Sequence, residues 1–80
     1  MEDEIIETIR NTISFITAIN KTNLKNDISL REYYRIDIWE FHEIIFSLEE
    51  KFDVEIASES DSLDTINDLC ECIIRKLENF

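Results

Sequence analysis

The chain has 80 residues and a formal net charge of −11, from 19 acidic and 8 basic side chains. A chain this short buries only about 60% of its unfolded surface. We therefore expect one domain over residues 1–80, with no deep catalytic cleft and no enzymatic activity of its own. The negative surface repels phosphate backbones and disfavours nucleic acid as a ligand. It favours a basic protein face as partner, although the same charge also keeps a small protein soluble.

Glycine and proline are both absent from the chain. Without glycine, left-handed helix caps and tight hairpin turns lose their usual residue, so we expect an all-α fold. No apolar run approaches the roughly 18–20 residues that a membrane span needs. The first residues, MEDEIIE, are acidic where a signal peptide would be basic, which predicts a cytoplasmic protein.

The first predicted helix runs from Glu2 to about Asn20. Its acidic first turn suits the positive end of the helix dipole. Apolar residues recur at helical spacing and predict one core-facing stripe. These residues are Ile5, Ile6, Ile9, Ile13 and Ile16, with Phe15 and Ile19 beside them.

The segment that follows lacks a clear period. Residues 21–27, KTNLKND, are polar and predict a loop. Residues 28–36, ISLREYYRI, predict an extended link, with one short helical turn around Leu30 to Tyr34.

Asp37 is a predicted N-cap for a second helix, from about Ile38 to Lys51. The core-facing stripe of this helix comprises Phe41, Ile44, Ile45, Leu48 and Phe52. Trp39, His42 and Phe46 lie well over ~100° around the helix from the centre of that stripe. We expect these three side chains to be only partly buried unless a partner covers them.

Residues 54–62, VEIASESDS, predict a link with one helical turn, and the last helix begins near Asp64 or Thr65. The inward residues of this helix are Leu63, Ile66, Leu69, Cys70, Ile73, Ile74 and Leu77. Cys70 and Cys72 point about 200° apart on a helix, so we expect neither a metal site nor a disulfide. Cys70 is a predicted core residue, and Cys72 has no predicted role.

LEEKFDVEI, residues 48–56, is similar to the end of the second helix in the acyl carrier protein family. Counting back from it places Asp37, Ile38 and Trp39 on the family's Asp-Ser-Leu. DISL at 27–30 matches the loop before that helix, and LDTINDL at 63–69 resembles the start of the last helix. The resemblance implies a right-handed four-helix bundle of three main helices and one very short helix.

The departures from the family pattern bear on function. In the family, the serine at this position carries 4′-phosphopantetheine, and Ile38 has no hydroxyl to attach it. Arg35 stands where the family often has glycine, and Trp39 stands where it has leucine. The resemblance therefore implies a carrier-like protein without this cofactor.

Ser62 is the alternative attachment site, because residues 61–65 spell DSLDT, a sequence of many true carriers. Only 18 residues follow Ser62, too few for the two helices that follow the site in a carrier. Choosing Ser62 also discards the gapless match upstream, so we favour position 38.

The predicted role is a partner-docking or regulatory module for an acyl-transfer or biosynthetic enzyme, and we expect a monomer. Carrier proteins present glutamates of this helix to basic patches on their enzymes, and the resemblance gives this role to the second helix here. The predicted docking residues are Asp37, Ile38, Trp39, Glu40, His42, Glu43, Phe46, Glu49 and Glu50. Alternatively, Trp39 folds back over the core.

Two other functions stay open from the sequence. The first is a genuine carrier of fatty-acid or polyketide synthesis whose serine lies elsewhere or whose position 38 has been altered. The second is an unrelated acidic helical interaction module, which a different helix order or handedness would reveal.

Overall fold

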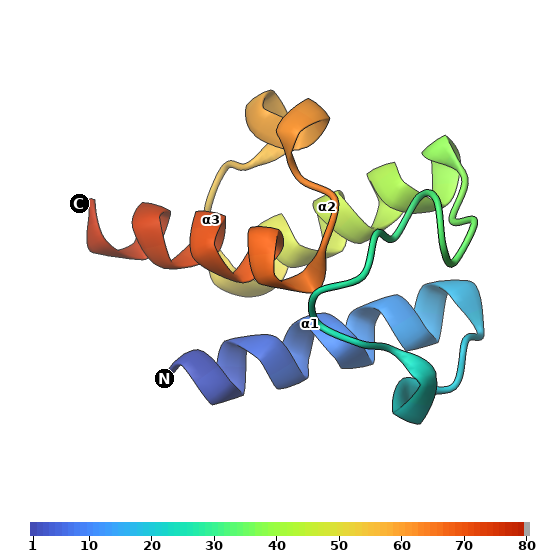
Figure 1. The fold of residues 1–80 in the computed structure, drawn as a ribbon. Coiled ribbons are helices and arrows are strands. Elements are labelled where there is room, and N and C mark those ends of the chain that lie inside the picture. Colours follow the sequence, from blue (N-terminus) through green and yellow to red (C-terminus); the bar gives the residue numbers. More distant parts are fainter. Residues whose placement is uncertain (80) are drawn as a thin grey trace.

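The computed structural model describes residues 1–79, and every regular element in them is helical (Figure 1). The predicted all-α fold is confirmed. Its elements are α1 (Glu2–Thr17), the 3₁₀ segment η1 (Lys21–Asn23), α2 (Ile38–Phe52), the 3₁₀ segment η2 (Ala57–Ser62) and α3 (Ile66–Glu78). α1 packs against both α2 and α3. Within residues 1–79, no helix is both long and apolar enough to span a membrane.

α1 ends at Thr17, three residues before the predicted boundary at Asn20. The hydroxyls of its last turn explain the early end, because they bind the backbone of Ile19 in place of a continuing helix. Ser14 Oγ donates to the Ile19 carbonyl at 2.6 Å, and Thr17 Oγ1 accepts from the Ile19 N–H at 3.2 Å. Ala18 then adopts a left-handed conformation, with φ of 64°.

Left-handed caps therefore form in this chain without glycine, the residue that usually occupies them. Ala18 closes α1 and Asp53 closes α2, each donating its N–H to a carbonyl four residues earlier. A non-glycine residue in this conformation suffers a clash of its Cβ that costs about 1–2 kcal/mol. The capping hydrogen bonds and the packing of the flanking segments offset this strain.

We expect Ala18→Gly to raise the free energy of unfolding by about 0.5–1 kcal/mol. Glycine removes the Cβ clash, and its greater freedom in the unfolded chain cancels part of that gain. Urea denaturation followed by circular dichroism measures the difference.

Ala57→Gly is the matched control, because Ala57 begins η2 and does not have a positive φ. Without a clash to relieve, glycine there lowers the free energy of unfolding by about 0.5–1 kcal/mol. Equal destabilisation by the two substitutions would contradict the account of the α1 cap.

α2 begins with a capping box at the predicted residue. The Asp37 carboxylate accepts from the Glu40 N–H at 2.8 Å, and the Glu40 carboxylate accepts from the Asp37 N–H at 3.4 Å. Two backbone donors at the helix start are satisfied in this way. The helix continues to Phe52, one residue beyond the predicted end.

α3 has the same kind of start. Thr65, one of the two predicted caps, accepts from the Asp68 N–H at 3.0 Å, and Asp68 accepts from the Thr65 N–H at 3.1 Å. Arg75 and Lys76 lie in the last turn, as predicted from the helix dipole.

The long connection between α1 and α2, residues 18–37, is held in place by hydrogen bonds and burial. Leu30 is fully buried, and its N–H donates to the Asp64 carbonyl at 2.8 Å. Nearby, the Asn67 N–H donates to the Asn26 carbonyl at 3.0 Å. These bonds join the connection to the start of α3. The predicted turn after Leu30 is present. The Ile36 N–H donates a hydrogen bond to the Leu30 carbonyl at 3.2 Å.

Arg10 of α1 holds the first part of the same connection. Its Nη1 donates to the Leu24 carbonyl and, at 3.1 Å, to Asn26 Oδ1. Its Nη2 donates to the Lys21 carbonyl at 2.6 Å. One guanidinium thus satisfies three acceptors in a segment without α-helix.

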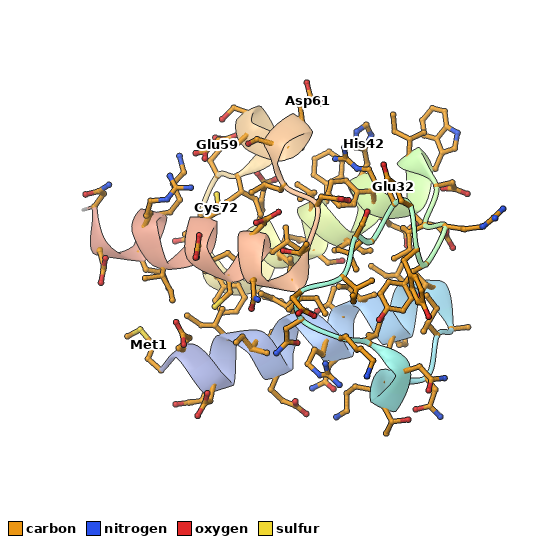
Figure 2. All side chains as sticks on the ribbon, in the orientation of Figure 1. Met1, Glu32, His42, Glu59, Asp61 and Cys72 are labelled. Atoms are coloured by element: carbon orange, nitrogen blue, oxygen red, sulfur yellow. The ribbon has the colours of Figure 1, made fainter. Side chains whose placement is uncertain are left out.

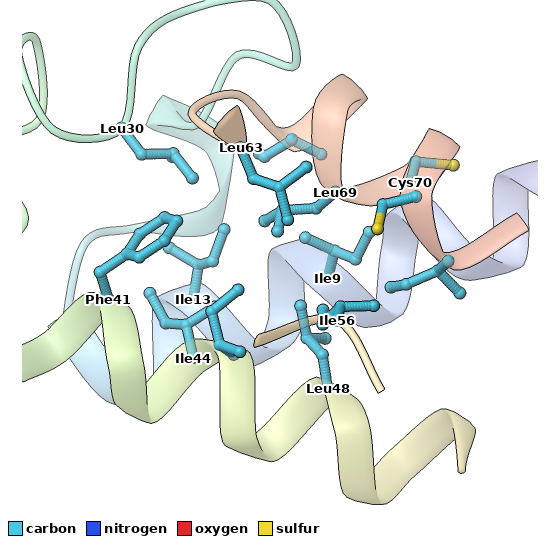
Figure 3. Packing of buried hydrophobic residues seen from close by; sticks show 14 of the residues in the cluster. Ile9, Ile13, Leu30, Phe41, Ile44, Leu48, Ile56, Leu63, Leu69 and Cys70 are labelled. Carbon is cyan, nitrogen blue, oxygen red and sulfur yellow. The ribbon is translucent and has the colours of Figure 1, made fainter. Parts of the chain in front are cut away.

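The core forms where the apolar stripes of the three α-helices meet the connection (Figure 3). The predicted stripes are confirmed at most positions. The buried apolar residues are Ile5, Ile9, Ile13, Leu24, Leu30, Ile36, Phe41, Ile44, Ile45, Leu48, Ile56, Leu63, Ile66, Leu69, Cys70, Cys72 and Ile73. Ile6, Ile16, Ile19, Phe52, Ile74 and Leu77 are partly buried at its edge.

Two residues differ from their predictions. Phe15 was expected beside the core stripe of α1, but it is 90% exposed because it lies on the opposite side of the helix from Ile9 and Ile13. Cys72 was given no role, yet it is fully buried. η2 covers that side of α3 and brings Glu59 beside the Cys72 thiol (Figure 2).

Candidate docking surface

The outward side of α2 carries large apolar side chains in solvent. Trp39 is 78% exposed, Ile38 63% and Phe46 61%. The alternative in which Trp39 folds back over the core is therefore wrong. Isolated exposed apolar residues are ordinary, but several on one helix face mark an interaction surface.

We name the nine predicted residues of this helix the docking surface: Asp37, Ile38, Trp39, Glu40, His42, Glu43, Phe46, Glu49 and Glu50. His42, Glu43 and Glu50 are exposed like the apolar residues beside them. Helical geometry places Glu43 and Glu50 beside Trp39, on the side away from His42, and places Glu40 away from this group. Figure 2 shows His42 on the same side of the molecule as Asp61 of η2.

Two adjacent hollows lie between α2 and η2. One has a volume of about 150 Å³, and His42, Phe46, Ala57 and Ser60 contribute to its lining. The other has a volume of about 170 Å³ and extends past Ile38 towards Asp61. His42 and Ser60 line both hollows, so the two form a pair with His42 between them.

Arg31 forms a wall of the second hollow and was not predicted. Its guanidinium lies 4.3 Å from the centroid of the Phe41 ring, and its Nη2 donates to the Ser60 carbonyl at 2.7 Å. Its backbone N–H contacts the Asp64 carboxylate at 3.3 Å. Arg31 thus joins the long connection to η2 beside Ile38. Because Arg31 and Ser60 are 29 residues apart in the sequence, no local sequence pattern predicts the contact between them.

The structure divides the predicted carboxylates into two groups. Glu40 and Asp37 are engaged in the capping box. Glu49 Oε2 accepts from the N–H groups of Ile56 and Ala57, at 2.8 and 2.9 Å, and so holds the start of η2. The carboxylates of Glu43 and Glu50 form no hydrogen bond or ion pair with residues 1–79, and both residues are exposed to a partner.

Ser62 lies in a different setting from position 38. It is the last residue of η2, and its Oγ donates to the Glu59 carbonyl at 2.9 Å. Ile38, by contrast, is the first residue of α2 and directly follows its N-cap. Ser62 thus lies at the C-terminal end of a 3₁₀ segment, whereas Ile38 lies at the N-terminal end of an α-helix.

Arg35, two residues before the α2 cap, adopts a left-handed conformation with φ of 56°. Glycine is the residue that accepts this conformation without strain. The chain therefore places a strained arginine two residues before the docking surface.

The two cysteines are free and buried. Burial raises the pKa of both thiols, and the Glu59 carboxylate beside Cys72 raises the pKa of that thiol further. Hydrogen bonds from Lys76 and Arg75 hold the pKa of Glu59 itself below its usual value. Among residues 1–79, no group of three or more His, Cys, Asp or Glu residues is arranged to hold a metal ion.

No protein-family model matches the chain, and a comparison with curated proteins finds no significant relative.

Proposed function

We propose that this protein is a docking module with a carrier-like surface and without a phosphopantetheine arm of its own. Its partner is an acyl-transfer or biosynthetic enzyme, which it engages as a regulatory or structural subunit through the docking surface of α2.

The exposure of Ile38, Trp39 and Phe46 on one face carries this proposal. Burying a large apolar side chain is worth about 1.5–3 kcal/mol, and aromatic residues dominate the binding energy of protein interfaces. The neighbouring hollows, of about 150 and 170 Å³, are each large enough for one apolar side chain of a partner.

The surrounding charge supports a basic partner. Glu43 and Glu50 on α2 and Asp61 on η2 are exposed around the apolar residues. The whole chain carries a net charge of −11, which accelerates encounter with a positive surface and excludes acidic competitors.

The carrier-like part of the proposal is supported by the register around position 38. Ile38 is the exposed first residue of α2, and the resemblance aligns it with the attachment serine. Arg35 has the left-handed backbone that suits the glycine often found there in the family. The element order, with a short η2 between α2 and α3, is compatible with a carrier bundle.

Affinity capture from the source cell extract tests the docking surface. We expect immobilised wild-type protein to retain one or more basic proteins and the double variant W39A/F46A to retain at least tenfold less. Both side chains are mostly exposed, so their removal leaves the core intact. Quantitative mass spectrometry of the eluates measures the difference.

Tyr33→Ala is the control variant, because Tyr33 is a 71% exposed aromatic outside the docking surface. It should retain the same proteins as wild type, and salt should elute them because the contact is partly ionic. Equal retention by W39A/F46A and wild type would overturn the assignment of this surface.

A further inference from the structure

α1 carries a second exposed apolar surface, remote in sequence from the docking surface. Met1 is 82% exposed and Phe15 is 90% exposed, the highest value among the large apolar side chains of residues 1–79. Helical spacing places Met1, Glu4, Thr8 and Phe15 along one side of α1.

Two hollows follow this side of α1. One, of about 430 Å³, lies between α1 and α2 and is lined by residues that include Thr8, Thr12, Phe15 and Lys51. The other, of about 410 Å³, lies nearer the helix start and is lined by Met1, Glu4, Ile5, Thr8, Phe52 and Leu77. Thr8 lines both, so the hollows form one groove, which we name the α1 groove.

We propose that the α1 groove binds a second copy of this chain, with the two α1 helices antiparallel and a two-fold axis at Thr8. Phe15 lies seven residues after Thr8 and Met1 lies seven residues before it, which is about 10.5 Å along the helix in each direction. The two-fold axis therefore places Phe15 of each copy over the Met1 hollow of its partner. The interface is self-complementary, as two-fold symmetry requires.

The charges of α1 favour this antiparallel arrangement. All four of its carboxylates, Glu2, Asp3, Glu4 and Glu7, lie in its first half, and residues 11–17 carry no charged side chain. Antiparallel packing sets each acidic half against the uncharged half of the partner. It also pairs the helix dipoles favourably, whereas parallel packing would bring the acidic halves together.

Two symmetry-related ion pairs complete the fit. The two-fold axis at Thr8 sets Glu4 of one copy opposite Thr12 of the other, and Lys51 lines the same hollow as Thr12. Neither Glu4 nor Lys51 forms an ion pair within residues 1–79, where every ion pair involves Glu7 or Glu59. Glu4 of each copy is thus placed to meet Lys51 of its partner.

The test is sedimentation velocity of the full chain from about 10 µM to about 1 mM, because an interface built on one helix per copy is small and weak. We expect wild type to pass from monomer to dimer within this range. F15S should weaken association about a hundredfold, since each dimer loses two aromatic anchors. The exposed-aromatic control Y33S should associate like wild type.

Charge reversal separates this dimer from nonspecific apolar association. E4K and K51E should each weaken association about tenfold, and the double variant E4K/K51E should restore it, because the pair is rebuilt with opposite sign. A monomeric wild type at 1 mM, unchanged association of F15S, or no recovery in the double variant would each overturn the proposal. These outcomes are independent of partner capture by α2.

Discussion

Phe41→Ala is expected to lower the free energy of unfolding by about 3–5 kcal/mol. Phe41 is 1% exposed, and Figure 3 shows it on α2 facing Leu30 of the long connection. Truncation removes the transfer free energy of the ring and leaves a cavity that neighbours cannot fill. A domain of this size has a total stability of about 4–12 kcal/mol, so much of it is lost.

The Phe41 ring also supports the docking surface indirectly. The Arg31 guanidinium lies over it and binds the Ser60 carbonyl, so the ring helps to hold η2 beside α2. Loss of this contact adds about 0.5–1 kcal/mol to the cost of the cavity.

Phe46→Ala is the matched control, since it is the same substitution five residues along the same helix at a side chain that is 61% exposed. We expect a change within about 0.5 kcal/mol. Urea denaturation measures both variants. Similar losses at the two positions would contradict the assignment of the buried and outward faces of α2.

Arg10→Met is expected to lower the free energy of unfolding by about 2–3 kcal/mol. Methionine retains most of the apolar stem but none of the three hydrogen bonds that hold the connection. Bonds to a charged donor contribute about 1.5–3 kcal/mol each when buried, and the part-buried setting here lets water replace some of them.

Arg10→Lys separates charge from geometry. Lysine keeps the positive charge but cannot place donors on separated acceptors as the guanidinium does, so we expect about half of the loss. Urea denaturation measures the stability of both variants. Amide hydrogen exchange at residues 22–26 should accelerate in both. Stability of R10M equal to wild type would show that the connection is held by its buried leucines alone.

The helices and their starts could be predicted because their causes are local. Residue type and the apolar spacing that follows predicted the α2 cap at Asp37 and limited the α3 cap to Asp64 or Thr65, of which Thr65 is the cap. The outward position of Trp39, His42 and Phe46 followed from the same periodicity.

The remaining features depend on contacts between distant segments. Cys72 is buried because η2 folds over α3, which no local pattern predicts. Glu49 accepts hydrogen bonds from Ile56 and Ala57 because the chain turns back after α2, which is equally invisible in the local sequence. The left-handed caps at Ala18 and Asp53 were not predicted, because glycine, the usual residue there, is absent and other residues adopt this conformation only at an energetic cost.

Intact-mass measurement after incubation with coenzyme A and a broad-specificity phosphopantetheinyl transferase tests the central claim, a carrier-like docking protein without an arm. Wild type and Ile38→Ser should be treated side by side with an authentic carrier protein. We expect no mass change for wild type and one added phosphopantetheine for I38S, because the substitution restores the missing hydroxyl at the start of α2. An adduct on wild type, on Ser62 or any other residue, would contradict the loss of the arm. An unmodified but folded I38S beside a modified carrier would contradict the carrier-like register.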